Sequence, residues 1–362
     1  MKPTIHPNAS GGGPRPPLRI GFMPLTDCAP IVMAHELGIY GKFGLHVQLR
    51  REREWATLRD KLINGEVDAI QALATMPFAL QLGLHCEPCA CVTGMVLSLQ
   101  GNAITLSEDL RRRGVVGGPS LRREVFRTFG RKTLTFGVPS ATSTHTLLLR
   151  HWLKSAQINP DHHVRIIALS PLEMYPNLKL GNLDGFCVGE PWSSLAVDAG
   201  VGFCVATSTA LAPLHPEKVL LVRRDFAEDR ADEHLRLIAA LLESCRFCDD
   251  RTNWGTLRSV LTHPNYVNAP VECLLSELDV PVDARPSVVR AFHDQTIFHR
   301  HYANDPSPAR ADWIIGELVA SGLVSSFRVA ALYEELRKTF RRDLYCEALE
   351  LVPDEIRLAV NN

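Results

Sequence analysis

Long hydrophobic runs are absent from this sequence. No stretch of about 18 apolar residues occurs in its 362 residues, so we expect no membrane-spanning helix. The first 17 residues hold three consecutive glycines and five prolines. They lack the run of about 7–15 apolar residues that a secretory signal requires. We therefore expect residues 1–17 to form a disordered arm and the chain to be cytoplasmic.

A strong excess of either charge is also missing. The chain has 39 basic and 40 acidic residues, for a net charge of −1. This balance argues against an acidic tail and against direct nucleic-acid binding through bulk charge. No Gly-x-x-x-x-Gly-Lys-Ser/Thr loop is present, so the chain is not expected to hydrolyse ATP.

The ten cysteines do not form the dense pattern of a disulfide scaffold, and they fit a reducing compartment. Two Cys-x-x-Cys pairs, Cys86/Cys89 and Cys245/Cys248, suggest a zinc site. However, 155 residues lie between Cys89 and Cys245, whereas zinc modules use about 12 to 20. We expect no metal site and no cofactor.

Short apolar segments alternate with helical ones through residue 206. Residues 18–22 are expected to form a strand, and Asp27 and Pro30 introduce a helix at 31–38 whose N-terminal amides face a ligand cleft. Such alternation favours a parallel α/β architecture. Further strands are expected at 45–49, 67–70, 91–96, 103–106, 134–138, 164–168, 183–188 and 202–206, and helices at 55–64, 76–82 and 145–154.

Beyond Arg223 the sequence is mainly helical, with expected helices at 233–248, 310–323 and 328–351. The one basic region runs from Arg111 to Lys132. It is interpreted as a solvated loop and helix face, with a partner-docking surface as the alternative. Nucleic acid is disfavoured, because only Phe126 and Phe129 interrupt the basic residues.

Several motifs, in this order and spacing, resemble the nitrate and bicarbonate substrate-binding proteins of ABC importers. The resemblance is stronger to their cytoplasmic relative, the nitrate/nitrite sensor of the Nas assimilation system. It covers nearly the whole chain. The motifs are GFMPLTDCAP at 21–30, WATLRDK at 55–61, GNAIT at 101–105, STH at 143–145, GEPW at 189–192, HPEKV at 215–219, FHR at 298–300 and WII at 313–315.

This resemblance implies the α/β type II periplasmic-binding-protein fold, two lobes whose hinge closes on one ligand. Residues 18–103 with 213–362 would form lobe 1 and its helical C-terminal extension, and residues 104–212 would form lobe 2. The family's ligand-binding positions correspond to Trp55, Asn102, His145, Gly189 and Lys218. Asn102 stands where the importers are expected to have glutamine, so Gln100 remains a second candidate for the amide.

The chemistry of these residue types suits a small planar oxyanion such as nitrate, which accepts hydrogen bonds and carries no proton. One ammonium with indole, imidazole, carboxamide and backbone N–H donors gives a donor-only pocket with a single positive charge. Bicarbonate can donate a proton to a carboxylate, so Lys218 in place of glutamate favours nitrate or nitrite. His145 opens an expected helix, where the helix dipole favours a neutral imidazole.

Each of these residues also has a purely structural interpretation. Lys218 could be an exposed lysine, Trp55 a surface contact, and Asn102 a turn or strand-edge residue. Gly189 could be an ordinary turn glycine before Pro191; as a ligand residue, it would let the backbone approach the anion.

The resemblance implies a cytoplasmic sensor that binds nitrate or nitrite and controls an antiterminator response regulator through lobe closure. The alternative is a solute-binding or regulatory component of a nitrate ABC transporter. A third interpretation, an enzyme, has little support because no catalytic constellation stands out. We expect no enzymatic activity, no direct nucleic-acid contact and no membrane insertion.

Overall fold

The computed structural model describes residues 16–270, 273–274 and 296–359. The predicted N-terminal arm therefore lies, except for its last two residues, outside the described residues. None of the helices in the described part is both long and apolar enough to cross a membrane.

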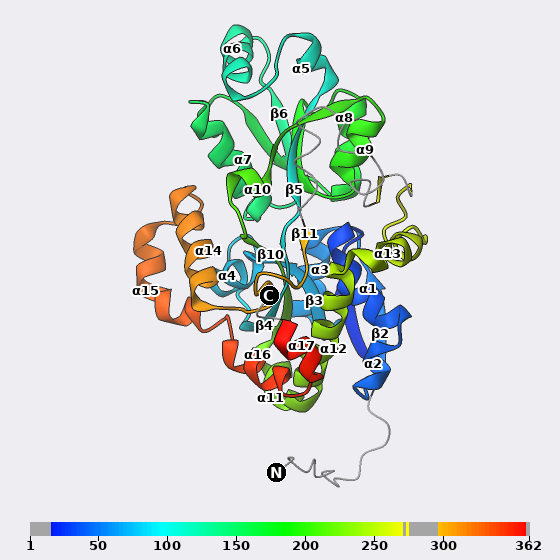
Figure 1. The fold of residues 1–362 in the computed structure, drawn as a ribbon. Helices are drawn as coiled ribbons and strands as arrows, with labels where there is room; N and C mark the ends of the chain where they lie inside the picture. Colours follow the sequence, from blue (N-terminus) through cyan, green and yellow to red (C-terminus); the bar gives the residue numbers. More distant parts are fainter. Residues whose placement is uncertain (1–15, 271–272, 275–295, 360–362) are drawn as a thin grey trace.

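Two β-sheets organise the chain, one in each half of the molecule (Figure 1). The first has six strands in the order β11 (Thr296–Ile297), β4 (Cys91–Gln100), β10 (Pro216–Arg223), β3 (Ala69–Leu73), β1 (Leu18–Phe22) and β2 (Val47–Arg51). The second has five, in the order β7 (Arg165–Ala168), β6 (Thr135–Val138), β8 (Gly185–Gly189), β5 (Asn102–Ser107) and β9 (Gly202–Thr207).

Most helices belong to the half that contains the first sheet. There, α1 packs on α12, α12 on α16, and α14 on α15. These helices are η1 (Thr26–Cys28), α1 (Ala29–Glu36), α2 (Ile39–Lys42), α3 (Trp55–Ile63), α4 (Met76–Leu82), α11 (Arg224–Asp229), α12 (Ala231–Asp249), η2 (Arg251–Asn253), α13 (Trp254–Leu261), α14 (Pro308–Ala320), α15 (Ser326–Arg337), α16 (Arg342–Leu349) and α17 (Asp354–Ala359).

The second sheet is covered by the remaining helices, with α7, α8 and α9 against β8 and α5 against β5. They are α5 (Glu108–Arg112), α6 (Gly118–Thr128), α7 (Thr144–Ser155), α8 (Pro171–Lys179), α9 (Trp192–Asp198) and α10 (Ser208–Leu211). The predicted basic region lies on and around α5 and α6, where Arg113 and Arg127 both pair with the buried Glu124.

The chain passes directly from the first sheet to the second between β4 and β5. Gln100 and Gly101 at this crossing have φ angles of 61° and 90°. A Cβ on Gly101 would lie only 2.5 Å from Thr296 Oγ1, so glycine satisfies both the backbone conformation and the close approach. The chain returns between α10 and β10, which places Asn102 and Lys218 beside the two crossings.

The two halves share part of their core. One buried cluster includes Met23 and Trp55 from the first half together with Leu147 of α7 and Val188 of β8. Polar groups packed against this shared cluster are therefore shielded from solvent, which strengthens their electrostatic interactions.

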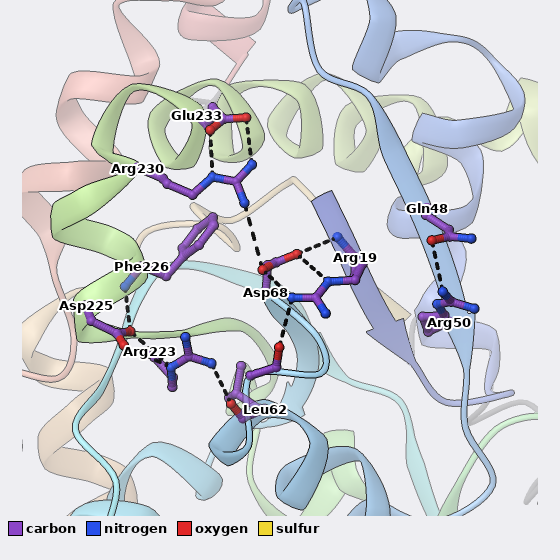
Figure 2. A network of polar contacts seen from close by, with 11 residues as sticks. Arg19, Gln48, Arg50, Leu62, Asp68, Arg223, Asp225, Phe226, Arg230 and Glu233 are labelled. Atoms are coloured by element: carbon purple, nitrogen blue, oxygen red, sulfur yellow. Dashed lines mark hydrogen bonds and ion pairs between the residues drawn. The ribbon is translucent and has the colours of Figure 1, made fainter. Parts of the chain in front are cut away.

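A polar network outside the region between the two sheets connects several elements of the first half (Figure 2). Asp68, just before β3, accepts hydrogen bonds from the backbone N and Nε of Arg19 on β1, at 2.8 and 3.1 Å. Arg230 lies 3.8 Å from Asp68 Oδ1 and pairs with Glu233 of α12 at 2.7 Å. These contacts tie α12 to the neighbouring strands β1 and β3.

Two expectations from the sequence are wrong in detail. The sheets are mixed, because β10 runs antiparallel to β3 and β4, and β5 runs antiparallel to β8 and β9. The segment 328–351 forms two helices, α15 and α16, and not one. Between them Thr339 O accepts from Thr93 N and Arg341 N donates to Thr93 O, so strand-like pairing to β4 interrupts the helix.

Candidate ligand-binding site

Lys218 is completely buried between the two halves, with 0% of its surface exposed. Its Nζ atom lies 2.8 Å from Asp27 Oδ2 and 2.7 Å from Glu217 Oε1. Burial lowers the pKa of this ammonium, but the two carboxylates more than compensate, so its pKa is raised above the ordinary value. The lysine is therefore a fixed buried cation.

Glu217 connects Lys218 to the second half of the molecule. Its Oε2 atom accepts hydrogen bonds from Asn102 Nδ2 of β5 at 2.7 Å and from Thr144 Oγ1 of α7. His215 Nε2 lies 3.3 Å from the same oxygen. Burial raises the pKa of Glu217, but Lys218 and the neighbouring histidines outweigh that effect and hold the pKa below its usual range.

Asp27 approaches Lys218 from the first half, at the carboxyl end of β1. Its second oxygen, Oδ1, accepts from Gln71 Nε2 at 2.6 Å, and Gln71 Oε1 in turn accepts from Met23 N at 3.0 Å. Burial raises the pKa of Asp27, and the attraction of Lys218 only partly opposes it. Asp27 has fewer donors than Glu217, so it is the carboxyl group more easily protonated.

His145 lies in the first turn of α7, a helix capped by Ser143, whose Oγ accepts from Thr146 N at 3.3 Å. The ring is fully buried, and its Nε2 atom is 3.5 Å from Glu217 Oε1. Neither ring nitrogen has a hydrogen-bond partner within the described part of the chain. Burial lowers the pKa of His145 to about 3, so the imidazole is neutral with one N–H to donate.

Trp55 begins α3 and is 3% exposed. Its ring centroid lies 5.6 Å from Lys218 Nζ, within cation–π range. The indole Nε1 is buried and has no partner among the described residues. The same side chain lines a cavity of about 350 Å³ that Arg59, Thr75 and Ser140 also line, so Trp55 borders both this cavity and the lysine.

Asn102 and Gly189 pair across β5 and β8. A Cβ built on Gly189 would lie 3.4 Å from Asn102 Oδ1 and 3.6 Å from Asp27 Oδ2, so the missing side chain leaves space bounded by both oxygens. Gln100 points elsewhere, since its Oε1 accepts from Leu214 N at 2.9 Å. Of the two amides, Asn102 is the one whose Nδ2 contacts Glu217 beside Lys218.

The structure thus brings all five predicted residues to one buried location. The expectation of a donor-only pocket with a single positive charge is wrong, because Asp27 and Glu217 both border Lys218. Sequence reasoning missed Glu217 because neighbours on a regular strand face opposite sides. The β10 pairing is irregular on both sides of Lys218, which lets the two side chains reach the same cluster. Asp27 carried a weak signal, its place after the first strand.

The cysteines do not add a second candidate site. Cys86 and Cys89 are partly exposed near α4, while Cys245 and Cys248 are buried in α12, and all four are free thiols. Among the described residues, no group of three or more histidine, cysteine, aspartate or glutamate side chains is arranged to hold a metal ion.

The chain is similar to known proteins of nitrate import and nitrate binding. The chain is 38% identical over 91% of its length to the nitrate import ATP-binding protein NrtC of Synechocystis sp., of which the match covers 49%. It therefore spans about half the length of this curated relative. It is 29% identical over 97% of its length to the nitrate/nitrite binding protein NrtA of Synechococcus elongatus, and covers 82% of that protein.

A solved structure has the same fold. The periplasmic nitrate-binding protein NrtA of Synechocystis superimposes with a TM-score of 0.83 and 24% identity, over 94% of this chain and 90% of that one. This confirms the predicted periplasmic-binding-protein fold. The model of the NMT1-like family matches residues 11–261. The chain belongs to the NMT1-like family.

Proposed function

We propose that the protein binds nitrate or nitrite between its two lobes, with Trp55, Asn102, His145, Gly189 and Lys218 as the ligand-binding residues. One observation carries the proposal: the buried ammonium of Lys218 lies beside an indole N–H and an imidazole that have no partner in the described structure. Buried donors are normally paired, so unpaired ones next to a buried cation favour an anionic ligand. The nitrate-binding relatives support this choice of anion.

Calorimetric titration of the purified chain with nitrate, nitrite, bicarbonate and an alkanesulfonate tests the proposal. We expect saturable one-site binding of nitrate or nitrite that is tighter than binding of the other two anions. Lys218→Glu is expected to abolish it, because a third carboxylate would then face the anion. Circular dichroism of the variant checks that it is folded. Absence of heat with both nitrate and nitrite contradicts the proposal.

We further propose that the protein acts as a cytoplasmic sensor. Ligand-driven lobe closure would change the surface offered to an antiterminator response regulator, which the ligand-free protein holds inactive. A pull-down of that regulator from zero to millimolar nitrate tests this step. Recovery of the regulator should fall as nitrate rises, and a recovery that stays constant contradicts the sensor role.

A second candidate function is a solute-binding or regulatory component of a nitrate importer. The observation in its favour is the 38% identity to about half of an import ATP-binding protein. If this function is correct, the same pull-down should recover the importer's ATPase subunit and not the response regulator. Both candidates describe a binding protein and assign no catalytic step to the site.

A further inference from the structure

The site already contains acceptors where an anion would have to fit. Lys218 is bonded to both Asp27 and Glu217, and the space beside Gly189 is bounded by Asn102 Oδ1 and Asp27 Oδ2. Nitrate and nitrite offer only acceptors. An ionised carboxylate facing such an anion inside a buried site is strongly unfavourable, since charge repulsion is screened little there.

The two carboxylates differ in how firmly they are held. Glu217 accepts from Asn102, Thr144 and Lys218, and it also faces His215. Among the described residues, Asp27 accepts from Gln71 and Lys218 alone, and its Oδ2 atom is the one that borders the Gly189 space. A proton on Asp27 Oδ2 would turn an opposing acceptor into a donor aimed at the ligand.

We propose that the site takes its anion together with one proton, which Asp27 holds. The inference rests on the proposed function and names a specificity-determining residue for it. When the anion replaces Asp27 as a partner of Lys218, the protonated carboxyl donates to an oxygen of the ligand. Glu217 stays ionised and keeps Lys218, Asn102 and Thr144 in place.

Other titratable groups face this cluster from the elements around it. His145 lies on α7, His215 directly before β10, Glu217 on β10 and Cys187 on β8. Glu190 directly follows β8, and its backbone O accepts from Thr26 N at 2.8 Å. His215 has acceptors at both ring nitrogens, Ala212 O at 2.8 Å and Glu217 Oε2 at 3.3 Å. Burial raises the pKa of Glu190 to about 7, inside the pH range of the test, so the test must separate Glu190 from Asp27.

The test is nitrate calorimetry between about pH 6 and pH 8, in pairs of buffers with different ionisation enthalpies. The wild type should take up about one proton per nitrate, and its Kd should rise about tenfold per pH unit. Asp27→Asn supplies an amide donor at the same position. It should bind nitrate at least about tenfold more tightly than the wild type at pH 8, and its Kd should not change with pH.

Asp109→Asn is the matched control, because Asp109 is exposed on α5 at the far end of the second half. It should keep both the pH dependence of the nitrate Kd and the proton uptake.

Nitrate binding by the wild type without proton uptake overturns the inference and leaves the proposed function standing. A nitrate Kd that still depends on pH in Asp27→Asn also overturns the inference, because another group would then take up the proton. If Asp27→Asn does not fold, Asp27→Ser replaces it in the same measurement, and a pH-dependent Kd in that variant overturns the inference. Absence of nitrate and nitrite binding by the wild type overturns both proposals.

Discussion

At the scale of single residues, the site depends on one carboxylate as much as on its lysine. Glu217 receives hydrogen bonds from β5 and α7 and binds Lys218 on its own strand. Removing one partner of a buried pair leaves the other charge uncompensated. Glu217 is thus a structural part of the site, although its own charge disfavours an anion nearby.

Glu217→Gln should lower the free energy of unfolding by about 3 kcal/mol near neutral pH. The pKa of Glu217 in the folded protein lies below its ordinary value of 4.5, so the ionised carboxylate stabilises the fold above about pH 4.5. That contribution is lost as the pH falls toward the folded-state pKa. Urea unfolding at several pH values measures it. Glu335→Gln, at an exposed pair with Lys338, should leave stability unchanged, and an equal loss in both variants contradicts the account.

Trp55→Phe removes the unpartnered indole N–H and keeps an aromatic ring beside Lys218. The loss of one hydrogen bond to nitrate should raise the Kd about tenfold, while thermal stability stays nearly constant because the N–H has no partner in the described structure. Trp254→Phe is the control, since its Nε1 donates to Cys248 O at 2.9 Å. It should lower stability and leave the Kd unchanged. A changed stability and an unchanged Kd for Trp55→Phe would contradict the assignment of Trp55 to the ligand-binding site.

At the scale of elements, the sequence predicted the βα units well and the returning strand poorly. The strands predicted at 18–22 and 91–96 and the helix predicted at 76–82 follow directly from apolar spacing and from nearby Pro or Gly residues, although β4 extends to Gln100. The strand β10 was not predicted, because the charged residues Glu217 and Lys218 lie near its beginning. Those polar residues are buried by partners on β5, α7 and η1, which local sequence does not reveal.

The crossing between β4 and β5 has a specific requirement at Gly101. Gly101→Ala should destabilise the protein by more than about 1 kcal/mol, since the residue has φ 90° and its new Cβ would meet Thr296 Oγ1. Gly114→Ala is a matched control with φ 83° and no atom within 4 Å. Differential scanning calorimetry of both variants isolates the steric part. Equal decreases in melting temperature would show that the backbone conformation alone, and not the contact with Thr296, destabilises the Gly101 variant.

At the scale of the whole molecule, the burial of Lys218 has a consequence for ligand entry. Because 0% of the lysine is exposed and one apolar cluster is shared by both halves, we expect the halves to move apart when an anion enters the site. The five site residues come from α3, β5, α7, β8 and β10, so their convergence is a property of the whole fold. The family resemblance predicted this convergence, whereas composition and periodicity did not.

Lobe opening should be visible in solution. Small-angle X-ray scattering is expected to give a smaller radius of gyration with saturating nitrate than without it, because the ligand stabilises the closed arrangement. Chloride at the same ionic strength is the control and should have no effect. An identical radius in both conditions contradicts ligand-driven closure.

The most direct test of the central claim is the nitrate affinity of Lys218→Gln compared with the wild type by calorimetry. This change removes the buried positive charge and retains an amide donor. We predict a loss of about hundredfold in affinity, with no loss for Lys179→Gln on the surface of α8. Nitrate binding of wild-type strength in the Lys218 variant would contradict the claim that this lysine holds the anion.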